Sequence, residues 1–263
     1  MYIDFHTHAF ADKIAQKAIA RLESVSKLKA YTDGTVGGLK RLLAEDKIDK
    51  AVFLPIATKP SQQEIINNLS ASLNSDDFIC FGSVHPDSPD ALNELERIKA
   101  LGLKGIKLHP DYQEFFVEDE KMLPIYKKCE ELGLIVVFHA GYDPLSPNLI
   151  HCLPQPSAQI AKRFPNLKIV LAHLGGMYRF EDVYNYVAGL PNVWLDTAFL
   201  ASRINDEMLE KIIRKHGADK VLLASDAPWQ RPADAVEQIQ NLPLSDTQKE
   251  WIFHKSAEQL LNL

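Results

Sequence analysis

Two histidines separated by one residue lie near the N-terminus: His6 and His8 flank Thr7. If this segment is a β-strand, side-chain alternation places both imidazoles on one face, about 6.6 Å apart along the strand. Two imidazoles at this spacing can bind one divalent metal ion. A pair of hydrogen-bonded histidines in a loop fits the pattern as well, so the spacing alone is weak support for a metal site.

Further polar side chains come at or just after the ends of short apolar segments. His139, His173 and Asp226 each end such a segment, and Lys107 and His109 lie at the end of another. The carboxyl ends of parallel strands in a barrel meet at one mouth, where active sites lie. Structural histidines scattered through the chain would not gather at strand ends in this way. Together with His6 and His8, these residues predict a metal site at the mouth.

The elements that must position these residues alternate regularly along the chain. Eight short apolar segments predict strands: Tyr2–His6, Ala51–Ile56, Phe78–Val84, Gly105–Leu108, Ile135–His139, Lys168–Ala172, Val193–Asp196 and Val221–Ser225. Helical periodicity between them predicts helices at Leu39–Asp46, Gln62–Leu73, Ala91–Leu101, Glu120–Leu132, Ser157–Phe164, Phe180–Ala188, Asp206–His216 and Pro232–Leu242, with a final helix at Ser245–Leu261.

This alternation is typical of an α/β protein with a parallel sheet. Eight such units in 263 residues predict a (β/α)8 TIM barrel that forms a single domain over residues 1–263. A doubly wound sheet with fewer strands is the alternative. The segment Ala11–Lys29 predicts an extra helix in the loop after the first strand. In that helix Ile14, Ala18, Ile19 and Leu22 form an apolar face that could cover the mouth or contact another subunit.

Composition excludes several classes of protein. With 46% hydrophobic residues the chain is not disordered, and its apolar segments are too short to span a membrane. A net charge of −6 argues against a nucleic-acid partner. The scattered Cys80, Cys129 and Cys152 suit reduced thiols, and no signal peptide is apparent, so we expect a cytoplasmic protein.

The polar segments together resemble the amidohydrolase superfamily and, within it, the amidohydrolase-related family. That family includes aminocarboxymuconate semialdehyde decarboxylase, resorcylate decarboxylases and lactone-opening hydrolases. The C-terminal helix is also similar, although the family usually has Asn where Ser256 stands. The matching segments, in chain order, are Ile3–His8, Gly105–Pro110, His139–Gly141, His173–Gly176 and Ser225–Pro228.

This resemblance implies that His6, His8 and His139 are metal ligands. It makes Asp226 a fourth ligand or a base, and His173 a catalytic residue that polarises the substrate or orients a water molecule. Three imidazoles and a carboxylate suit Zn²⁺, although Mn²⁺ could use the same ligands. We expect one ion per chain rather than two.

Lys107 bears on that number, because two-metal members of the superfamily often bridge their ions through a carboxylated lysine from the fourth strand. The alternative, which we favour, is a free lysine that binds a substrate carboxylate. His109 shares the face of Lys107 and is expected to contact substrate. Loop residues at the mouth should complete the substrate site, and they are Tyr112, Tyr142, Trp229 and Arg231.

The remaining polar residues have less definite roles. Asp4 is expected to share the face of His6 and to point into the barrel, either orienting a ligand or making a structural hydrogen bond. Asp196 could support a ligand, and His85 could line the mouth. We expect the other histidines to lie on the surface, namely His151, His216 and His254.

These observations predict a metal-dependent hydrolase in which metal-activated water cleaves an ester, lactone or amide of a small carboxylate-bearing substrate. The alternative is a metal-dependent non-oxidative decarboxylase of an unsaturated or aromatic acid, because the same ligands serve both reactions in the family. No residue separates the two. The resemblance also allows a homo-oligomer, and neither a membrane nor a nucleic acid is expected as a partner.

Overall fold

The computed structural model describes residues 1–263 and contains eight short parallel strands, one in each expected segment. Their β-branched and aromatic residues are buried, some inside the barrel and others under the helices that surround it. The strands pair in chain order in two groups, β1–β2–β3 and β4 to β8. Their bounds are β1 Ile3–Thr7, β2 Lys50–Phe53, β3 Phe78–Cys80, β4 Gly105–Leu108, β5 Ile135–Phe138, β6 Ile169–Leu171, β7 Val193–Asp196 and β8 Val221–Leu222.

Backbone contacts join the two groups at both edges. Beyond β3, Gly82 bridges Ile106 of β4, and beyond β8, Ala227 bridges Thr7 of β1. The Lys107 amide donates to the Gly82 carbonyl at 2.8 Å, and the His8 amide donates to the Ala227 carbonyl at 2.7 Å. The sheet is therefore closed, which confirms the predicted barrel and excludes the open doubly wound sheet.

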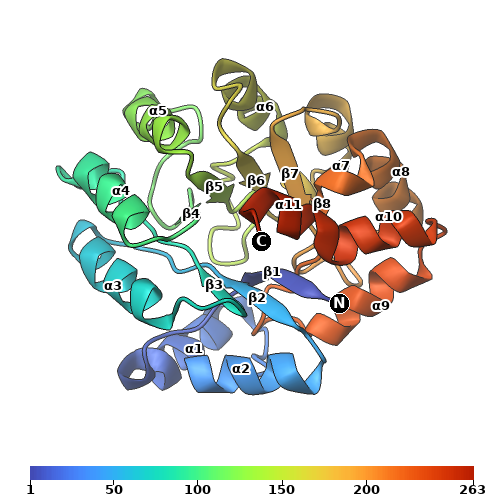
Figure 1. The fold of residues 1–263 in the computed structure, drawn as a ribbon, viewed down its shortest axis with the longest axis horizontal. Coiled ribbons are helices and arrows are strands. Elements are labelled where there is room, and N and C mark those ends of the chain that lie inside the picture. The colour runs from blue at the N-terminus through green and yellow to red at the C-terminus, as the bar shows by residue number, and fades with distance from the viewer.

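Helices surround the strands, as Figure 1 shows, with α11 near the centre of the ring. A turn of π-helix at Val183–Val187 continues α7, and another at Trp251–Lys255 joins α10 to α11. None of the helices combines the length and apolar character that a membrane crossing requires. Their bounds are α1 Asp12–Ser26, α2 Val36–Glu45, α3 Gln63–Leu73, α4 Ala91–Ala100, α5 Leu123–Leu132, α6 Pro154–Arg163, α7 Phe180–Asp182, α8 Asp206–His216, α9 Pro232–Asn241, α10 Asp246–Glu250 and α11 Ser256–Leu261.

The barrel has two apolar cores. The inner one includes Phe5, Ile79 and Val137 from the strands, together with Leu260 and Leu261 of α11. The larger one lies between strands and helices. Because α11 closes the inner core from the side on which the chain enters the strands, the opposite, carboxyl ends of the strands are left for chemistry.

A register shift in β1 decides which side chains face the barrel interior. Asp4 pairs with Ala51 and Thr7 with Phe53, so three steps along β1 correspond to two along β2. Phe5 belongs to the inner core, and yet His6 also points to the mouth. The expectation that Asp4 shares the face of His6 is therefore wrong, because the bulge interrupts the alternation.

The extra helix forms where the sequence predicts it, as α1 in the first loop. Ala15 and Ile19 are its buried residues. Ile14, which we placed on the covered face, is 49% exposed. The covered stripe is therefore narrower than the sequence suggests.

Candidate metal centre

Three potential ligand atoms from the two ends of the chain converge where β1 and β8 end. The Nε2 atoms of His6 and His8 are 3.0 Å apart. Asp226 Oδ1 lies 3.5 Å from His6 Nε2 and 3.2 Å from His8 Nε2. The barrel thus brings together three of the four predicted metal ligands as one donor set.

Contacts outside this set orient both imidazoles. His6 Nδ1 donates to Asp196 Oδ2 at 2.7 Å, and His8 Nδ1 donates to the Leu54 carbonyl at 2.8 Å. In the neutral imidazoles this leaves both Nε2 atoms as acceptors, facing each other and a carboxylate oxygen. Converging acceptors need a positive charge between them, so the donor set fits a divalent cation such as zinc or manganese.

Lys107 supplies a positive charge beside this set. Its Nζ lies 3.3 Å from His6 Nε2, and its side chain is fully buried. Burial lowers the pKa of Lys107 to about 8. Burial, with Lys107 next in importance, also holds the pKa of His6 well below its usual range, so that His6 stays a neutral ligand.

Asp226 keeps its charge in this environment. Burial alone would raise the pKa of Asp226, but the contact with His8 and the nearby His6 and His173 outweigh it and hold that pKa below its ordinary value. In Asp196 the effect of complete burial is larger than that of the nearby positive groups and hydrogen bonds, so the pKa of Asp196 is raised. An ionised Asp226 is suited to bind a cation or to accept a proton.

Two of the candidate catalytic residues have unusual backbone conformations. His173 has φ 55° and Asp226 has φ 68°, in the left-handed region that non-glycine residues rarely adopt. Such conformations cost about 1–3 kcal/mol each and cluster at functional sites. The surrounding barrel therefore holds both side chains at the mouth at some cost in stability.

His139 contacts two other histidines of the barrel mouth. Its Nδ1 is 3.0 Å from His173 Nε2, and its ring stacks on His109 with centroids 4.2 Å apart. His173 Nδ1 in turn donates to the Ala198 carbonyl at 2.9 Å. These contacts keep His139 at the mouth, and its role as a ligand of the same ion as His6 and His8, which the resemblance implies, stays a prediction.

Asp143 is a site residue that sequence reasoning missed. It is buried, Tyr112 donates its hydroxyl to Asp143 Oδ2 at 3.2 Å, and His109 Nε2 lies 3.6 Å from the same oxygen. Tyr112 also stacks on His109 with centroids 3.6 Å apart. A signal was available, since Asp143 follows His139 by four residues in the loop after β5.

The predicted substrate residues in the outer loops have different partners. Tyr142 packs against Tyr178, and the Trp229 amide donates to the Asp226 carbonyl. The expectation that Arg231 binds substrate is wrong. Its guanidinium forms an ion pair with Asp46, the residue that follows α2.

Several of the other histidines also differ from expectation. His85 is buried, and its Nδ1 accepts a hydrogen bond from the Asp87 amide. His216, expected on the surface, is buried between two backbone groups: it donates to Val193 and accepts from Gly189. His151 is half-buried and pairs with Asp111. These positions result from the α/β packing of distant segments, which the sequence pattern does not reveal.

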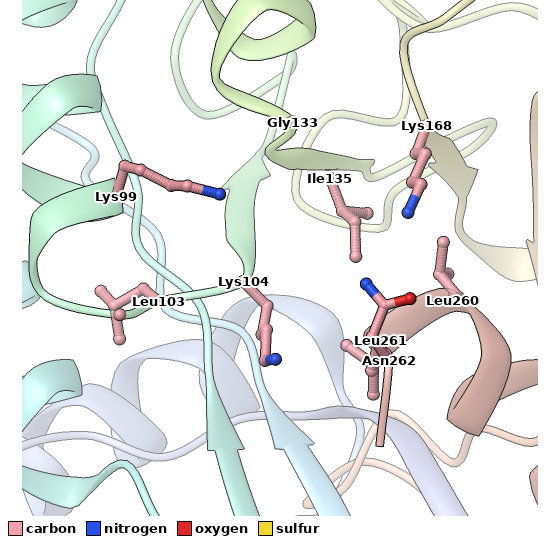
Figure 2. A pocket seen from close by; sticks show the side chains of 10 residues that line it. Lys99, Leu103, Lys104, Gly133, Ile135, Lys168, Leu260, Leu261 and Asn262 are labelled. Atoms are coloured by element: carbon pink, nitrogen blue, oxygen red, sulfur yellow. The ribbon is translucent and has the colours of Figure 1, made fainter.

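A separate pocket lies at the other end of the barrel (Figure 2). It has a volume of about 190 Å³, and Lys99, Lys104 and Lys168 line it beside the end of α11. Lys104 and Lys168 immediately precede β4 and β6, so this pocket is at the amino ends of the strands. No predicted site residue lines it, and we do not assign the reaction to it.

Comparisons with known proteins agree with the fold. A family model described as "Amidohydrolase" matches residues 3–263. Among curated proteins, 2-amino-3-carboxymuconate-6-semialdehyde decarboxylase from Dictyostelium discoideum is 27% identical over 228 residues. That alignment covers 73% of this chain and 63% of the relative, so the chain spans less than two thirds of the relative's length.

Solved structures with the same fold cover nearly the whole chain. A TIM-barrel protein from Bordetella bronchiseptica has a TM-score of 0.79 at 18% identity, covering 99% of this chain and 98% of that one. A 5-carboxyvanillate decarboxylase from Novosphingobium aromaticivorans, with bound manganese and 3-methoxy-4-hydroxy-5-nitrobenzoic acid, has a TM-score of 0.72 at 17% identity, covering 100% and 97%. At these identities the likeness supports the barrel fold.

Proposed function

Because this chain belongs to the amidohydrolase family, we propose that it is a metal-dependent enzyme that decarboxylates a small unsaturated or aromatic acid without an oxidant. The observation that carries the proposal is the likeness to the Dictyostelium decarboxylase over 73% of this chain. The site's donor set is compatible with it. This choice reverses the order expected from the sequence, in which hydrolysis came first.

The donor set of His6, His8 and Asp226 would hold the divalent cation. When bound, such an ion acts as a Lewis acid on substrate oxygen atoms. His6 depends on Asp196 for its orientation, through the 2.7 Å contact described above. Zinc and manganese both suit two imidazoles and a carboxylate, and the manganese in the Novosphingobium protein makes manganese a second choice to test.

The remaining residues would bind the acid and move a proton. Loss of CO2 leaves the electron pair of the broken C–C bond on carbon, which must then take up a proton. Lys107, buried beside His6, would attract the substrate carboxylate. His173 has its Nε2 directed at His139 and would carry the proton. His109, Tyr112, Tyr142 and Trp229 would contact the body of the substrate.

Hydrolysis is the second candidate function, and the ionised carboxylate of Asp226 favours it. Its pKa lies below the ordinary value, so Asp226 is ionised at neutral pH and has an oxygen free to take the proton of a water molecule activated by the cation. The same donor set serves either reaction, so the substrate decides between them.

The test is an assay of the purified protein, reconstituted with zinc or manganese, against unsaturated and aromatic acids, lactones and esters. We expect CO2 release from at least one acid and no such release by the His6→Ala, His8→Ala double variant. Hydrolysis of a lactone or ester without CO2 release from any acid would overturn the decarboxylase proposal. Equal activity of the double variant would overturn the metal assignment.

A further inference from the structure

The pocket at the amino ends of the strands is lined by three lysines and by no acidic residue. Lys99 lies in the last turn of α4, Lys104 directly precedes β4, and Lys168 directly precedes β6. Figure 2 shows Lys99 and Lys168 on opposite sides of the pocket, with Lys104 and Asn262 between them. Three positive charges therefore gather in one hollow of a chain whose net charge is −6.

These three lysines have no counter-charge among the side chains of the protein. Six other lysines form ion pairs with carboxylates, but none of the three that line the pocket does. A nearby example shows the contrast, since Lys128 of α5 pairs with Glu96 of α4 at 2.7 Å. The positive charge of the pocket is therefore not neutralised by acidic side chains.

The ends of helices offset only part of this charge. α4, α5 and α11 all end at the pocket, where Gly102, Gly133 and Asn262 line it. The carboxyl end of a helix carries about half a negative charge, so the three ends offset about one and a half of the three positive charges. The pocket therefore keeps a net positive charge that an anion can balance.

The shape of the pocket favours a small ion. Ile135, Leu260 and Leu261 give it an apolar wall, with exposed fractions of 3%, 2% and 1%. A hollow that combines such a wall with charges of one sign concentrates the electric field and attracts ions of the opposite sign. Its volume of about 190 Å³ is below the roughly 300–1,000 Å³ of pockets for drug-sized ligands.

We propose that this pocket binds a phosphate group through Lys99, Lys104 and Lys168, either as inorganic phosphate or as the phosphate of a small monoester. Lysine binds phosphate as a point charge, and a phosphate group carries about 1.5 to 2 negative charges at neutral pH. That charge matches what the helix ends leave unbalanced, whereas a single carboxylate supplies less.

The bound group would connect separate parts of the barrel. It would join the residues before β4 and β6 to the end of α11, the helix that closes the inner core. The pocket is at the opposite end of the strands from His6, His8 and Asp226. The proposal therefore does not depend on which reaction the enzyme performs.

Equilibrium dialysis of the purified protein against radiolabelled inorganic phosphate tests the proposal. The pocket variant is Lys104→Gln, Lys168→Gln, and we expect it to bind phosphate at least about tenfold more weakly, because it loses two charge-assisted contacts. Unlabelled glycerol phosphate and acetate are the competitors. Displacement by glycerol phosphate at lower concentration than by inorganic phosphate identifies a monoester site, and the reverse order identifies a site for the free ion. Displacement by acetate as effective as that by phosphate would overturn the proposal.

A variant with the same change in charge provides the control. Lys47 and Lys162 are exposed and lie outside the pocket. The variant Lys47→Gln, Lys162→Gln should bind phosphate like the wild-type protein. Equal affinity in the pocket variant and the wild type, as expected for binding only at the barrel mouth, would overturn the proposal. An equal loss in both variants would also overturn it, since it would show attraction by the overall charge.

Thermal unfolding gives a second measurement. A ligand that binds only the folded protein raises the midpoint of unfolding, so phosphate should raise it more in the wild type than in the pocket variant. Comparison at one phosphate concentration removes the general effect of this salt on stability. Parallel rises in the two proteins would contradict the proposal.

A crystal of the wild-type protein soaked in sodium tungstate locates the anion without any variant. Tungstate is a tetrahedral dianion like phosphate, and its anomalous scattering marks its position. We expect a peak among Lys99, Lys104 and Lys168, and absence of a peak there would overturn the assignment of these residues.

Discussion

Asp196→Asn tests whether an acceptor outside the donor set controls the metal affinity of His6. Asp196 Oδ1 accepts the backbone amides of His173 and Ala198 at 2.9 and 3.0 Å, and Oδ2 accepts from His6 Nδ1 at 2.7 Å. In the variant the amide oxygen should keep both backbone contacts. The new NH2 group then faces His6 Nδ1, so His6 must move its proton to Nε2. His6 Nε2 would no longer present a lone pair to a cation.

The size of the effect follows from this single buried contact. A hydrogen bond to a charged group contributes about 1.5–3 kcal/mol, and loss of such an outer partner typically weakens metal binding about tenfold to a hundredfold. We expect a change of that size in the dissociation constant of zinc, measured by competition with a chromophoric chelator. Folding should survive, because both backbone hydrogen bonds are retained.

Glu94→Gln provides the matched control. Glu94 is also a buried carboxylate, but its contacts are with Asn67 and Arg97. We expect the Glu94→Gln variant to bind zinc with the same affinity as the wild-type protein. Unchanged zinc affinity in Asp196→Asn, with circular dichroism like that of the wild type, would refute the reasoning about the His6 proton. An equal loss in Glu94→Gln would show a general effect of removing buried charge.

Four further outcomes are expected. The variant His6→Ala, His8→Ala should lose the cation held by His6, His8 and Asp226 and keep the circular dichroism of the wild-type protein. Full retention of metal would contradict the ligand assignment. Asp226→Asn should reduce turnover at least about a hundredfold in a steady-state assay, and near-normal turnover would remove Asp226 from the mechanism. Burial lowers the pKa of His216 to about 4, below its value of about 6.5 when unfolded, so its contribution to stability is complete above pH 6.5 and falls by up to about 3 kcal/mol towards pH 4. Urea unfolding at both pH values should show a steeper loss in the wild type than in His216→Gln, and parallel losses would contradict this. A crystal structure should show a free amino group at Lys107, and density for a carbamate there would contradict our choice.

The sequence by itself determined the barrel and the residues that reach its mouth. Apolar segments at regular spacing, separated by helical periodicity, have few ways to bury their surfaces other than a closed parallel sheet. A polar residue at the end of such a segment must then lie at the common edge. That is why His6, His8 and Asp226 could be placed at one mouth from their positions, although more than 200 residues separate His8 from Asp226. The family resemblance then implied which of the mouth residues are ligands.

Only the tertiary structure decided how these side chains are oriented and which partners they have. The bulge in β1 interrupted the alternation between Asp4 and His6, and His139 gained His173 and His109 as neighbours. Arg231 turned to Asp46, more than 180 residues earlier in the chain. Strand position sets where a Cα lies, but the direction of a side chain depends on hydrogen-bond partners from distant segments, and spacing along the sequence carries no record of them.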